Sequence, residues 1–207
     1  MRKGMFITFE GSEGCGKSTQ SKLLFEYLKR RGYRVIYLRE PGGTKISEKV
    51  RLILLDPKNN SMNSVCEMLL YMAARAEAVQ EVIAPAIAKG KIVICDRFLD
   101  STLAYQGYGL GMDIKFIRGL GRLVTRGVKP GLTILLDLPV EKGLKKCGRA
   151  KDRIEQRSVK YHVRVRKGYL RLARQEPGRI SLVKVAKDKS ATQENIRSLV
   201  DIFLKRR

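Results

Sequence analysis

Histidine, tryptophan and cysteine are scarce in this chain. Among its 207 residues there is one histidine, His162, no tryptophan and four cysteines. The cysteines, at positions 15, 66, 95 and 147, show neither a C-x-x-C pair nor another spacing typical of metal ligands. A single histidine cannot build a histidine metal site either. The composition therefore argues against a metal centre of histidine or cysteine ligands, and the cysteine pattern suits a reducing compartment.

Long apolar runs are also lacking. No stretch approaches the roughly 20 consecutive apolar residues that a membrane-spanning helix needs. The first predicted strand begins at Met5, which leaves no room for a signal peptide before it. We therefore expect a cytoplasmic protein without a membrane partner. Its 207 residues, 43% of them hydrophobic, suffice for one domain, residues 1–207, with a sizeable core.

Acidic residues are few compared with basic ones. The chain has 43 Lys and Arg against 20 Asp and Glu, which gives a net charge of +23. Such a chain attracts polyanions. The basic residues are spread along the sequence, most densely over 142–174, and no zinc-finger, RNA-recognition or homeodomain pattern accompanies them. Two interpretations stay open: a general property of the surface, or weak nucleic-acid binding without sequence preference.

A glycine-rich segment, GSEGCGKS, is the most informative motif that the sequence does contain. It fits the phosphate-binding pattern G-x-x-x-x-G-K-[ST], follows an apolar run and precedes a helical stripe. Its glycines let backbone N–H groups converge on phosphate oxygens, while Lys17 reaches the outer phosphates and Ser18 holds Mg²⁺. The alternative is a glycine-rich turn that contains a lysine by chance. The residues expected to bind the nucleotide are Gly11, Ser12, Glu13, Gly14, Cys15, Gly16, Lys17, Ser18 and Thr19.

Apolar runs and helical patterns alternate along the chain. Continuous apolar strands separated by helices predict a parallel sheet that is covered on both faces. We expect a P-loop NTPase-like, doubly wound α/β domain with a short lid and five strands, at 5–9, 34–38, 92–95, 132–136 and 179–185. Helices are expected at 17–31, 45–55, 64–89, 101–105, 113–125, 140–146, 158–174 and 190–205. Pro85 should kink the third of these or end its first part.

Polar residues follow three of the predicted strands. The first strand ends at Glu10 and the phosphate loop, the second at residues 39–44 and the third at Asp96-Arg97-Phe98. The carboxyl ends of strands in an open α/β sheet line one crevice, so these residues are expected to meet there. One arginine alone is more often a surface residue. Together with a phosphate loop, Arg39 and Arg97 predict an anion site.

Five segments, in this order, resemble the thymidylate kinase family over nearly the whole chain. They are FEGSEGCGKST, LREPGGT, YMAARAE, DRFLDSTLAYQG and DRIEQ. The first is shared by many kinases, whereas LREPGGT together with DR-x₃-S-x₂-AYQG is highly specific. The resemblance implies transfer of the γ-phosphoryl group of ATP to dTMP, giving dTDP for dTTP synthesis, with Mg²⁺ as cofactor. It also implies a homodimer, for which the apolar face of the helix at 64–89 is a candidate.

The resemblance assigns the phosphate contacts. Lys17 holds the donor phosphates, and Arg97 binds the acceptor phosphate, which it can grip through two nitrogens. Asp96 faces the metal or the acceptor through water. Arg51 is a second arginine on the acceptor side, unless it belongs to a solvated helix face. For Arg39 a role in structuring its loop is as good an interpretation.

The base pocket is implied by YMAAR and by the segment after Arg97. Tyr71 and Arg75 lie four residues apart, on one helix face. The resemblance has Tyr71, where many members carry phenylalanine, stack on thymine, and Arg75 bind a thymine carbonyl group. A core aromatic is the alternative for Tyr71. Thr102 and Gln106 line the other edge of the base, and Tyr105 lies against the sugar and crowds out a 2′-hydroxyl group.

The same resemblance implies roles for Glu13, for Ser101 and for the segment 184–188. Glu13 matches a family carboxylate that touches the 3′-hydroxyl group of the acceptor, which explains an acidic residue among anions. Ser101 is expected to cap the helix after Arg97. Residues 184–188 fall where the family contacts adenine, so we expect backbone contacts there.

A lid is implied at about residues 147–157. One class of the family carries an arginine at the position of Gly14 and uses it on the transferred phosphoryl group. The other class supplies this charge from its lid, where Arg149 is our first choice and Arg153 the second. Glu155 is expected to approach Mg²⁺ or the phosphates. Closure of such a lid also excludes water and so limits hydrolysis of ATP.

Two other functions compete with this interpretation. Another nucleotide or nucleoside kinase of the same fold would differ in the base pocket. A polyanion-binding protein with a vestigial kinase site would account for the net charge. A GTPase is disfavoured because the guanine motif N-K-x-D is absent.

Overall fold

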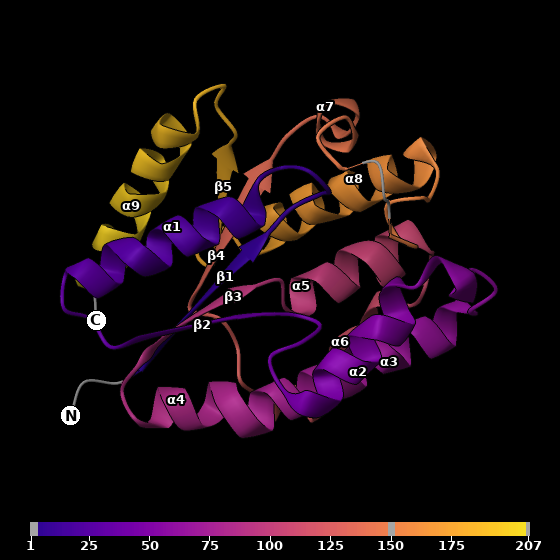
Figure 1. The fold of residues 1–207 in the computed structure, drawn as a ribbon, viewed down its shortest axis with the longest axis horizontal. Helices are drawn as coiled ribbons and strands as arrows, with labels where there is room; N and C mark the ends of the chain where they lie inside the picture. Colours follow the sequence, from indigo (N-terminus) through magenta and orange to yellow (C-terminus); the bar gives the residue numbers. More distant parts are fainter. Residues whose placement is uncertain (1–3, 149–151, 206–207) are drawn as a thin grey trace.

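The computed structural model describes residues 4–148 and 152–205. Its centre is a parallel sheet with the strand order β2-β3-β1-β4-β5 (Figure 1). β1 lies at the centre, with β3 and β2 on one side and β4 and β5 on the other, as in a doubly wound sheet. The strands are β1 (Met5–Glu10), β2 (Val35–Arg39), β3 (Ile92–Asp96), β4 (Leu132–Asp137) and β5 (Ile180–Lys184). The predicted fold class and all five strands are confirmed, with ends within a residue or so of those expected.

Helices cover both faces of the sheet, which is why the strands are apolar throughout. Ile7 of β1 packs in one cluster with Leu24 and Ile196, whereas its neighbour Phe6 packs with Ile83 on the opposite face. In Figure 1, α1 and α9 lie together on one side and α4 lies on the other. The helices are α1 (Lys17–Arg30), α2 (Lys45–Leu55), α3 (Ser64–Ala78), α4 (Ala84–Ala88), α5 (Leu99–Thr102), α6 (Ile114–Thr125), α7 (Val140–Leu144), α8 (Val159–Gln175) and α9 (Lys189–Lys205).

Two helical stretches contain wider, π-helical turns. Val79–Ile83 joins α3 to α4 just before Pro85, so the proline coincides with a change of helix type rather than with an end. Leu103–Gly109 prolongs α5 beyond the predicted residue 105. Such turns are frequent at functional sites, and this one carries Tyr105 and Gln106. A short 3₁₀ turn at Pro57–Asn59 was not expected from the sequence.

The predicted lid is described only in part. Arg149 lies outside the described residues. Residues 152–157 form turns against the end of α2, where the Arg153 amide donates to the carbonyl oxygen of Leu55. In the part of the chain that the structure covers, no helix has the length and apolar character needed to cross a membrane.

Candidate functional site

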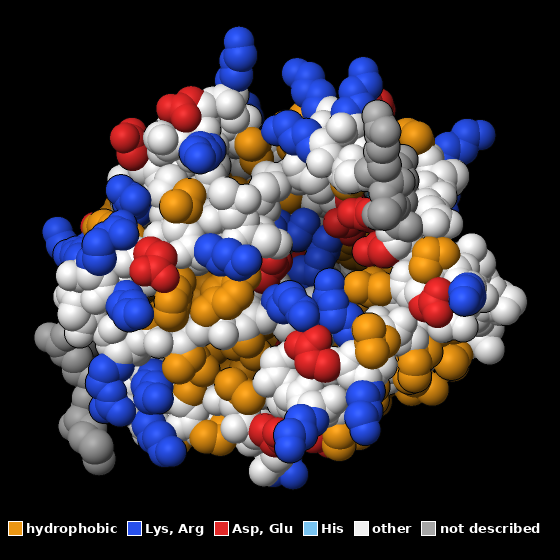
Figure 2. Space-filling model, in the orientation of Figure 1, with side chains coloured by type: hydrophobic (Ala, Val, Ile, Leu, Met, Phe, Trp, Pro, Cys, Tyr) orange, Lys and Arg blue, Asp and Glu red, His pale blue; other side chains and the backbone are white. Residues whose placement is uncertain are grey.

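A cleft of about 700 Å³ opens at the carboxyl ends of β1, β2 and β3. Its volume is typical of a site for small molecules. Figure 2 shows it as a hollow in the middle of the face, with basic and acidic side chains inside. The predicted residues that line it are Glu13, Gly14, Cys15, Gly16, Lys17, Ser18, Thr19, Arg51, Tyr71, Asp96, Arg97, Thr102, Tyr105, Gln106 and Glu155.

Three further candidates, Gly11, Ser12 and Arg75, do not line the cleft but contact residues that do. Lys17 donates to the carbonyl oxygen of Ser12, Arg97 donates to that of Gly11, and Arg75 donates to the hydroxyl group of Thr102. The tertiary structure therefore brings the candidates of the phosphate loop, the strand ends and the base pocket to one cleft, together with Glu155. These residues span positions 11 to 155 of the 207-residue sequence.

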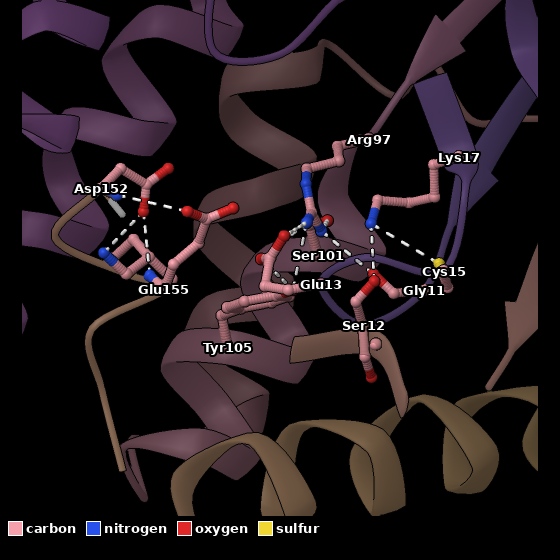
Figure 3. A network of polar contacts seen from close by, with 12 residues as sticks. Gly11, Ser12, Glu13, Cys15, Lys17, Arg97, Ser101, Tyr105, Asp152 and Glu155 are labelled. Atoms are coloured by element: carbon pink, nitrogen blue, oxygen red, sulfur yellow. Dashed lines mark hydrogen bonds and ion pairs between the residues drawn. The ribbon is translucent and has the colours of Figure 1, made fainter. Parts of the chain in front are cut away.

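The phosphate loop adopts a conformation that only its glycines allow. Gly14 and Gly16 have φ angles of 65° and 90°, in the left-handed region where residues with a side chain are strained. The loop encircles the Lys17 ammonium group, which donates to the carbonyl oxygen of Ser12 over 2.8 Å (Figure 3). Lys17 is only 6% exposed, so its charge is held in the loop rather than in solvent.

The phosphate loop also packs closely on the last turn of α7. A Cβ atom on Gly14 would lie 1.9 Å from the carbonyl oxygen of Gly143, and one on Gly143 would lie 2.2 Å from that of Glu13. Neither position has room for a side chain. The absence of an arginine at position 14 thus has a steric cause in this chain.

Ser18 and Asp96 meet where α1 begins and β3 ends. The Ser18 hydroxyl group donates to Oδ2 of Asp96. Two hard oxygen ligands side by side, next to a phosphate loop, are the donor set that Mg²⁺ prefers, since this ion completes its shell with water and substrate phosphates. The two residues therefore fit the predicted magnesium site.

Arg97 is the centre of the cleft's polar network (Figure 3). Its Nη2 atom donates to both carboxylate oxygens of Glu13, over 2.8 and 2.9 Å, and to the Tyr105 hydroxyl group over 3.1 Å. Its guanidinium group also lies 4.9 Å from the centre of the Tyr105 ring. The backbone of Arg97 has φ 73°, an unusual conformation for a residue with a side chain. The strained turn directs this guanidinium group toward the phosphate loop.

The charges of Glu13 and Arg97 support each other. Burial raises the pKa of Glu13, but Arg97 and Lys17 outweigh burial and lower this pKa to about 2. Burial likewise disfavours the charged form of Arg97, yet Glu13 keeps the pKa of Arg97 well above its ordinary value. Both groups therefore stay ionised at neutral pH, as an anion clamp and its counterion must.

Glu10 holds the turn that carries Arg97, a role that sequence reasoning missed. Its carboxyl group accepts from the Phe98 amide over 2.8 Å, from the Ser101 hydroxyl group over 2.6 Å and from the Tyr169 hydroxyl group over 2.8 Å. Burial and the nearby charge of Asp100 raise the pKa of Glu10 to about 7. A carboxyl group at the end of a buried strand was the signal that could have identified it.

Ser101 does not cap its helix as expected. The helix begins after Phe98, and Ser101 lies inside α5, where its hydroxyl group bonds to Glu10 and accepts from Arg97 over 3.2 Å. The prediction failed because the turn at Arg97 lets the helix start earlier. Ser101 thus supports the arginine rather than the helix end.

The two arginines near β2 have different surroundings. Arg39 donates to Glu48 over 3.0 Å and to the Pro41 carbonyl oxygen over 2.8 Å, and its side chain is 42% exposed. These contacts favour the loop-structuring interpretation. Arg51 is half-buried in the cleft wall and also donates to Pro41, over 3.1 Å. Burial and the charge of Arg39 lower the pKa of Arg51. Its position disagrees with a solvated helix face.

The residues predicted for the base pocket lie on α3 and on the helix after Arg97. Tyr71 lines the cleft, in disagreement with a plain core aromatic. Arg75 is 2% exposed and donates to Glu40 over 2.8 Å and to the Thr102 hydroxyl group over 3.0 Å. Glu40 was not foreseen as its partner, because that residue is far away in the sequence. The pair fixes the guanidinium group of Arg75 beside the pocket.

The described part of the lid separates its two candidates. Arg153 is only 3% exposed, donates to the Leu54 carbonyl oxygen over 2.7 Å and pairs with Glu67. Such a buried anchor favours Arg149 over Arg153 as the source of charge for the transferred phosphoryl group, and the choice between them stays a prediction. Glu155 lines the cleft and accepts from the amide of Asp152, across the cleft from Lys17 in Figure 3.

The other end of the cleft is formed by the segment after β5. Val185, Ala186 and Lys187 line it, and the Ala186 amide donates to the Thr192 hydroxyl group over 3.0 Å. This position agrees with the predicted adenine-contacting segment 184–188.

Comparisons with known proteins show similarity over most of the chain. A model of the family described as thymidylate kinase matches residues 9–196. The thymidylate kinase of Geotalea daltonii is 52% identical over 189 residues, which cover 87% of this chain and 88% of that protein. That of Symbiobacterium thermophilum is 47% identical over 204 residues, or 98% and 95% of the two chains. The crystal structure of thymidylate kinase from Ehrlichia chaffeensis, 36% identical, superimposes with a TM-score of 0.79 and covers 96% of this chain and 99% of that one.

Proposed function

The chain belongs to the thymidylate kinase family, and from this premise we propose that its cleft is the site where dTMP is phosphorylated. The protein is a kinase that transfers the γ-phosphoryl group of ATP to dTMP and so forms dTDP. The observation that carries the assignment is Arg97, which lies between the phosphate loop at Glu13 and the predicted nucleoside pocket at Tyr105. One guanidinium group thereby joins the donor and acceptor halves of the cleft.

The donor phosphates are held by the loop around Lys17. Backbone N–H groups of the loop and the start of α1 supply positive potential for the phosphate oxygens. Lys17 exchanges its bond to the Ser12 carbonyl oxygen for a bond to an outer phosphate oxygen. Phosphoryl transfer depends mainly on positioning and on neutralising charge, so this lysine acts on the reaction itself.

The acceptor is held by Arg97 and its neighbours. Arg97 donates to the phosphate of dTMP, while Glu13 and Tyr105 border the sugar. Glu13 accepts from the 3′-hydroxyl group, which gives this carboxylate a partner when Arg97 turns to the phosphate. Arg51 supplies a second positive charge from the cleft wall, where burial and the charge of Arg39 lower the pKa of its guanidinium group.

Ser18 and Asp96 are the residues that would hold Mg²⁺. The ion would neutralise charge on the phosphate oxygens during transfer. Ser18 would be a ligand, and Asp96 would contact the ion directly or through water. Glu155 and its neighbour Asp152 lie on the opposite side of the cleft, and the role of Glu155 near the metal or the phosphates stays a prediction.

The base of dTMP is placed between α3 and the π-helical segment. Tyr71 stacks on the thymine ring, Arg75 donates to a carbonyl group of the base, and Thr102 and Gln106 line its other edge. The Tyr105 ring lies against the sugar. Adenine lies at 185–187, with backbone contacts. The charge for the transferred phosphoryl group comes from the lid, with Arg149 as the first candidate.

The proposed function is tested by measuring ADP formation with ATP, Mg²⁺ and a series of acceptors. We expect the highest kcat/KM with dTMP, compared with dUMP, dCMP, dGMP and thymidine, because the pocket combines a stacking ring with Arg75 and Gln106. A higher kcat/KM with another acceptor would keep the phosphate chemistry but contradict the pocket. Absence of turnover from folded protein would contradict the function and favour polyanion binding.

We propose that the enzyme is a homodimer. Helix α3 packs beside both α2 and α6 (Figure 1). The three helices carry apolar side chains that are well exposed: Leu52, Leu69, Phe116 and Leu123. Large exposed apolar side chains on adjacent helices mark an interaction surface. A second copy of the chain, applied through the same helices, would cover it.

Charged side chains introduced on this apolar surface should separate the two copies. We expect Leu69→Glu and Leu123→Glu together to shift the sedimentation coefficient from that of a dimer to that of a monomer. Ile202→Glu serves as the control, because Ile202 is also about half exposed but lies on α9. A dimer that persists in the double variant, or that dissociates equally in the control, would contradict this interface.

The net charge of +23 leads to no second proposed function. In Figure 2 the basic side chains lie over many parts of the face, with acidic ones between them. This distribution supports a general surface property, and weak nucleic-acid binding stays a prediction. We propose the cytoplasm as the compartment, since the buried thiols of Cys15 and Cys95 suit a reducing environment.

A further inference from the structure

A buried glutamate on α3 joins the base pocket to the lid segment. Glu67 is 0% exposed and lies one helical turn before Tyr71. Its Oε1 atom accepts from Nε2 of Gln106 over 2.8 Å. Its Oε2 atom accepts from Arg153 and from Arg157, each over 2.6 Å. The proposed reaction gives none of these contacts a role, although Gln106 lines the cleft.

The two arginines determine which way the Gln106 amide faces. Two guanidinium groups donate to the same carboxyl group, so Glu67 binds them as a carboxylate, which can only accept hydrogen bonds. The Gln106 amide must then present its NH₂ end to Glu67. With the NH₂ group engaged in this way, the carbonyl oxygen Oε1 is the end left for a ligand in the cleft.

We propose that Glu67 is a positioning residue that makes Gln106 a hydrogen-bond acceptor for the base and thereby selects thymine over cytosine. This inference rests on the proposed function. Thymine carries a hydrogen on N3 and donates to an amide oxygen, whereas N3 of cytosine is an acceptor and meets the same oxygen without a bond. A site whose polar groups are left unpaired rejects the wrong substrate strongly.

The matched substrates are dTMP and 5-methyl-dCMP, which share the methyl group and the sugar phosphate and differ only at N3 and the 4-substituent. We expect Glu67→Gln to reduce the ratio of kcat/KM for dTMP to that for 5-methyl-dCMP at least about tenfold. A glutamine at position 67 can both donate and accept, so the Gln106 amide is free to turn and donate to N3 of cytosine. Arg75 is unchanged in every variant, so its contribution to base selection is the same in each of the compared ratios.

Two further variants separate positioning from packing. Arg157→Met removes an ion pair to Oε2 of Glu67 and leaves the hydrogen bond between Gln106 and Oε1. The ratio of kcat/KM for dTMP to that for 5-methyl-dCMP should therefore stay within about twofold of the wild-type ratio. Gln106→Ala removes the acceptor itself and should lower the ratio as much as Glu67→Gln does. A ratio unchanged in folded Glu67→Gln or in Gln106→Ala, or an equal loss in Arg157→Met, would overturn the proposal.

An independent measurement on the wild type covers the case in which Glu67→Gln does not fold. The side-chain NH₂ signals of Gln106, identified by their absence from Gln106→Ala, should exchange slowly with solvent, because they are buried and bonded to Glu67. Fast exchange would overturn the proposal. A wild-type enzyme that fails to phosphorylate dTMP would instead overturn the proposed function, so the two failures can be told apart.

Discussion

Arg97→Ala should lower kcat/KM for dTMP by about a hundredfold or more, the loss expected when a residue that positions the reacting phosphate is removed. Arg97 is the residue that contacts both Glu13 and Tyr105, and its strained turn is held by the buried Glu10. Loss of the guanidinium group removes the clamp while the phosphate loop remains. We therefore expect ATP binding, measured by calorimetry, to change little while turnover collapses.

Two comparisons make this prediction specific. Arg97→Lys retains the charge but not the two-nitrogen grip, so its activity should lie between those of the wild type and the alanine variant. Arg118→Ala removes an arginine that pairs with Glu176 away from the cleft, and its turnover should be unchanged. Near-wild-type turnover in Arg97→Ala would reject the acceptor clamp.

The same substitution should change the acid stability of the fold. Burial raises the pKa of Glu13, but Arg97 and Lys17 bring it down to about 2, below its ordinary value of 4.5. A carboxyl group with a lowered pKa stabilises the folded chain above its unfolded pKa, and this contribution is lost as the pH falls through the folded pKa. The difference in free energy of unfolding between the wild type and Arg97→Ala should therefore narrow from about pH 5 to pH 2.

Lys17→Met should reduce kcat by about a hundred- to a thousandfold, as expected when a positioned donor to a charged transition state is lost. The ammonium group of Lys17 is buried in the phosphate loop, where the Ser12 carbonyl oxygen holds it. Methionine has a similar length and no charge, so the loop keeps its packing. The loss should appear in kcat more than in the KM for dTMP, because the lysine acts on the donor phosphates.

A lysine on the same helix provides the control. Lys22 is exposed on α1, and Lys22→Met should leave both kinetic constants unchanged. Steady-state kinetics and thermal unfolding of the two variants would show whether any loss comes from folding. If Lys17→Met retained turnover within about threefold of the wild type, the assignment of this lysine to the donor phosphates would be wrong.

Local patterns were sufficient for much of the site. The spacing of glycines, Lys17 and Ser18 predicted the phosphate loop, because each conformation depends on residues within one short turn. The position of Asp96 and Arg97 at the end of a predicted strand placed them in the crevice, since parallel strands share one carboxyl edge. The likeness to a known family then supplied Tyr71, whose position at the cleft agrees with the expectation.

Other features could not be read from the sequence. The spacing of Ser101 was typical of a helix cap, yet its hydroxyl group bonds to Glu10, which lies 91 positions earlier. Arg153 looked like one more basic residue of a lid, whereas its guanidinium group is buried against Glu67. The π-helical turns that carry Tyr105 and Gln106 have no periodicity of their own in the sequence.

The sequence by itself determined the phosphate loop, the order of strands and helices and the edge of the sheet where the chemistry lies. These depend on short-range conformational preferences and on the alternation of apolar segments. Only the tertiary structure decided which donors the buried carboxyl groups find: Glu10 accepts from Tyr169, 159 positions away, and Glu67 pairs with Arg157, 90 positions away. A buried carboxylate must find a donor wherever the fold brings one, and this requirement is met across space and leaves no local pattern.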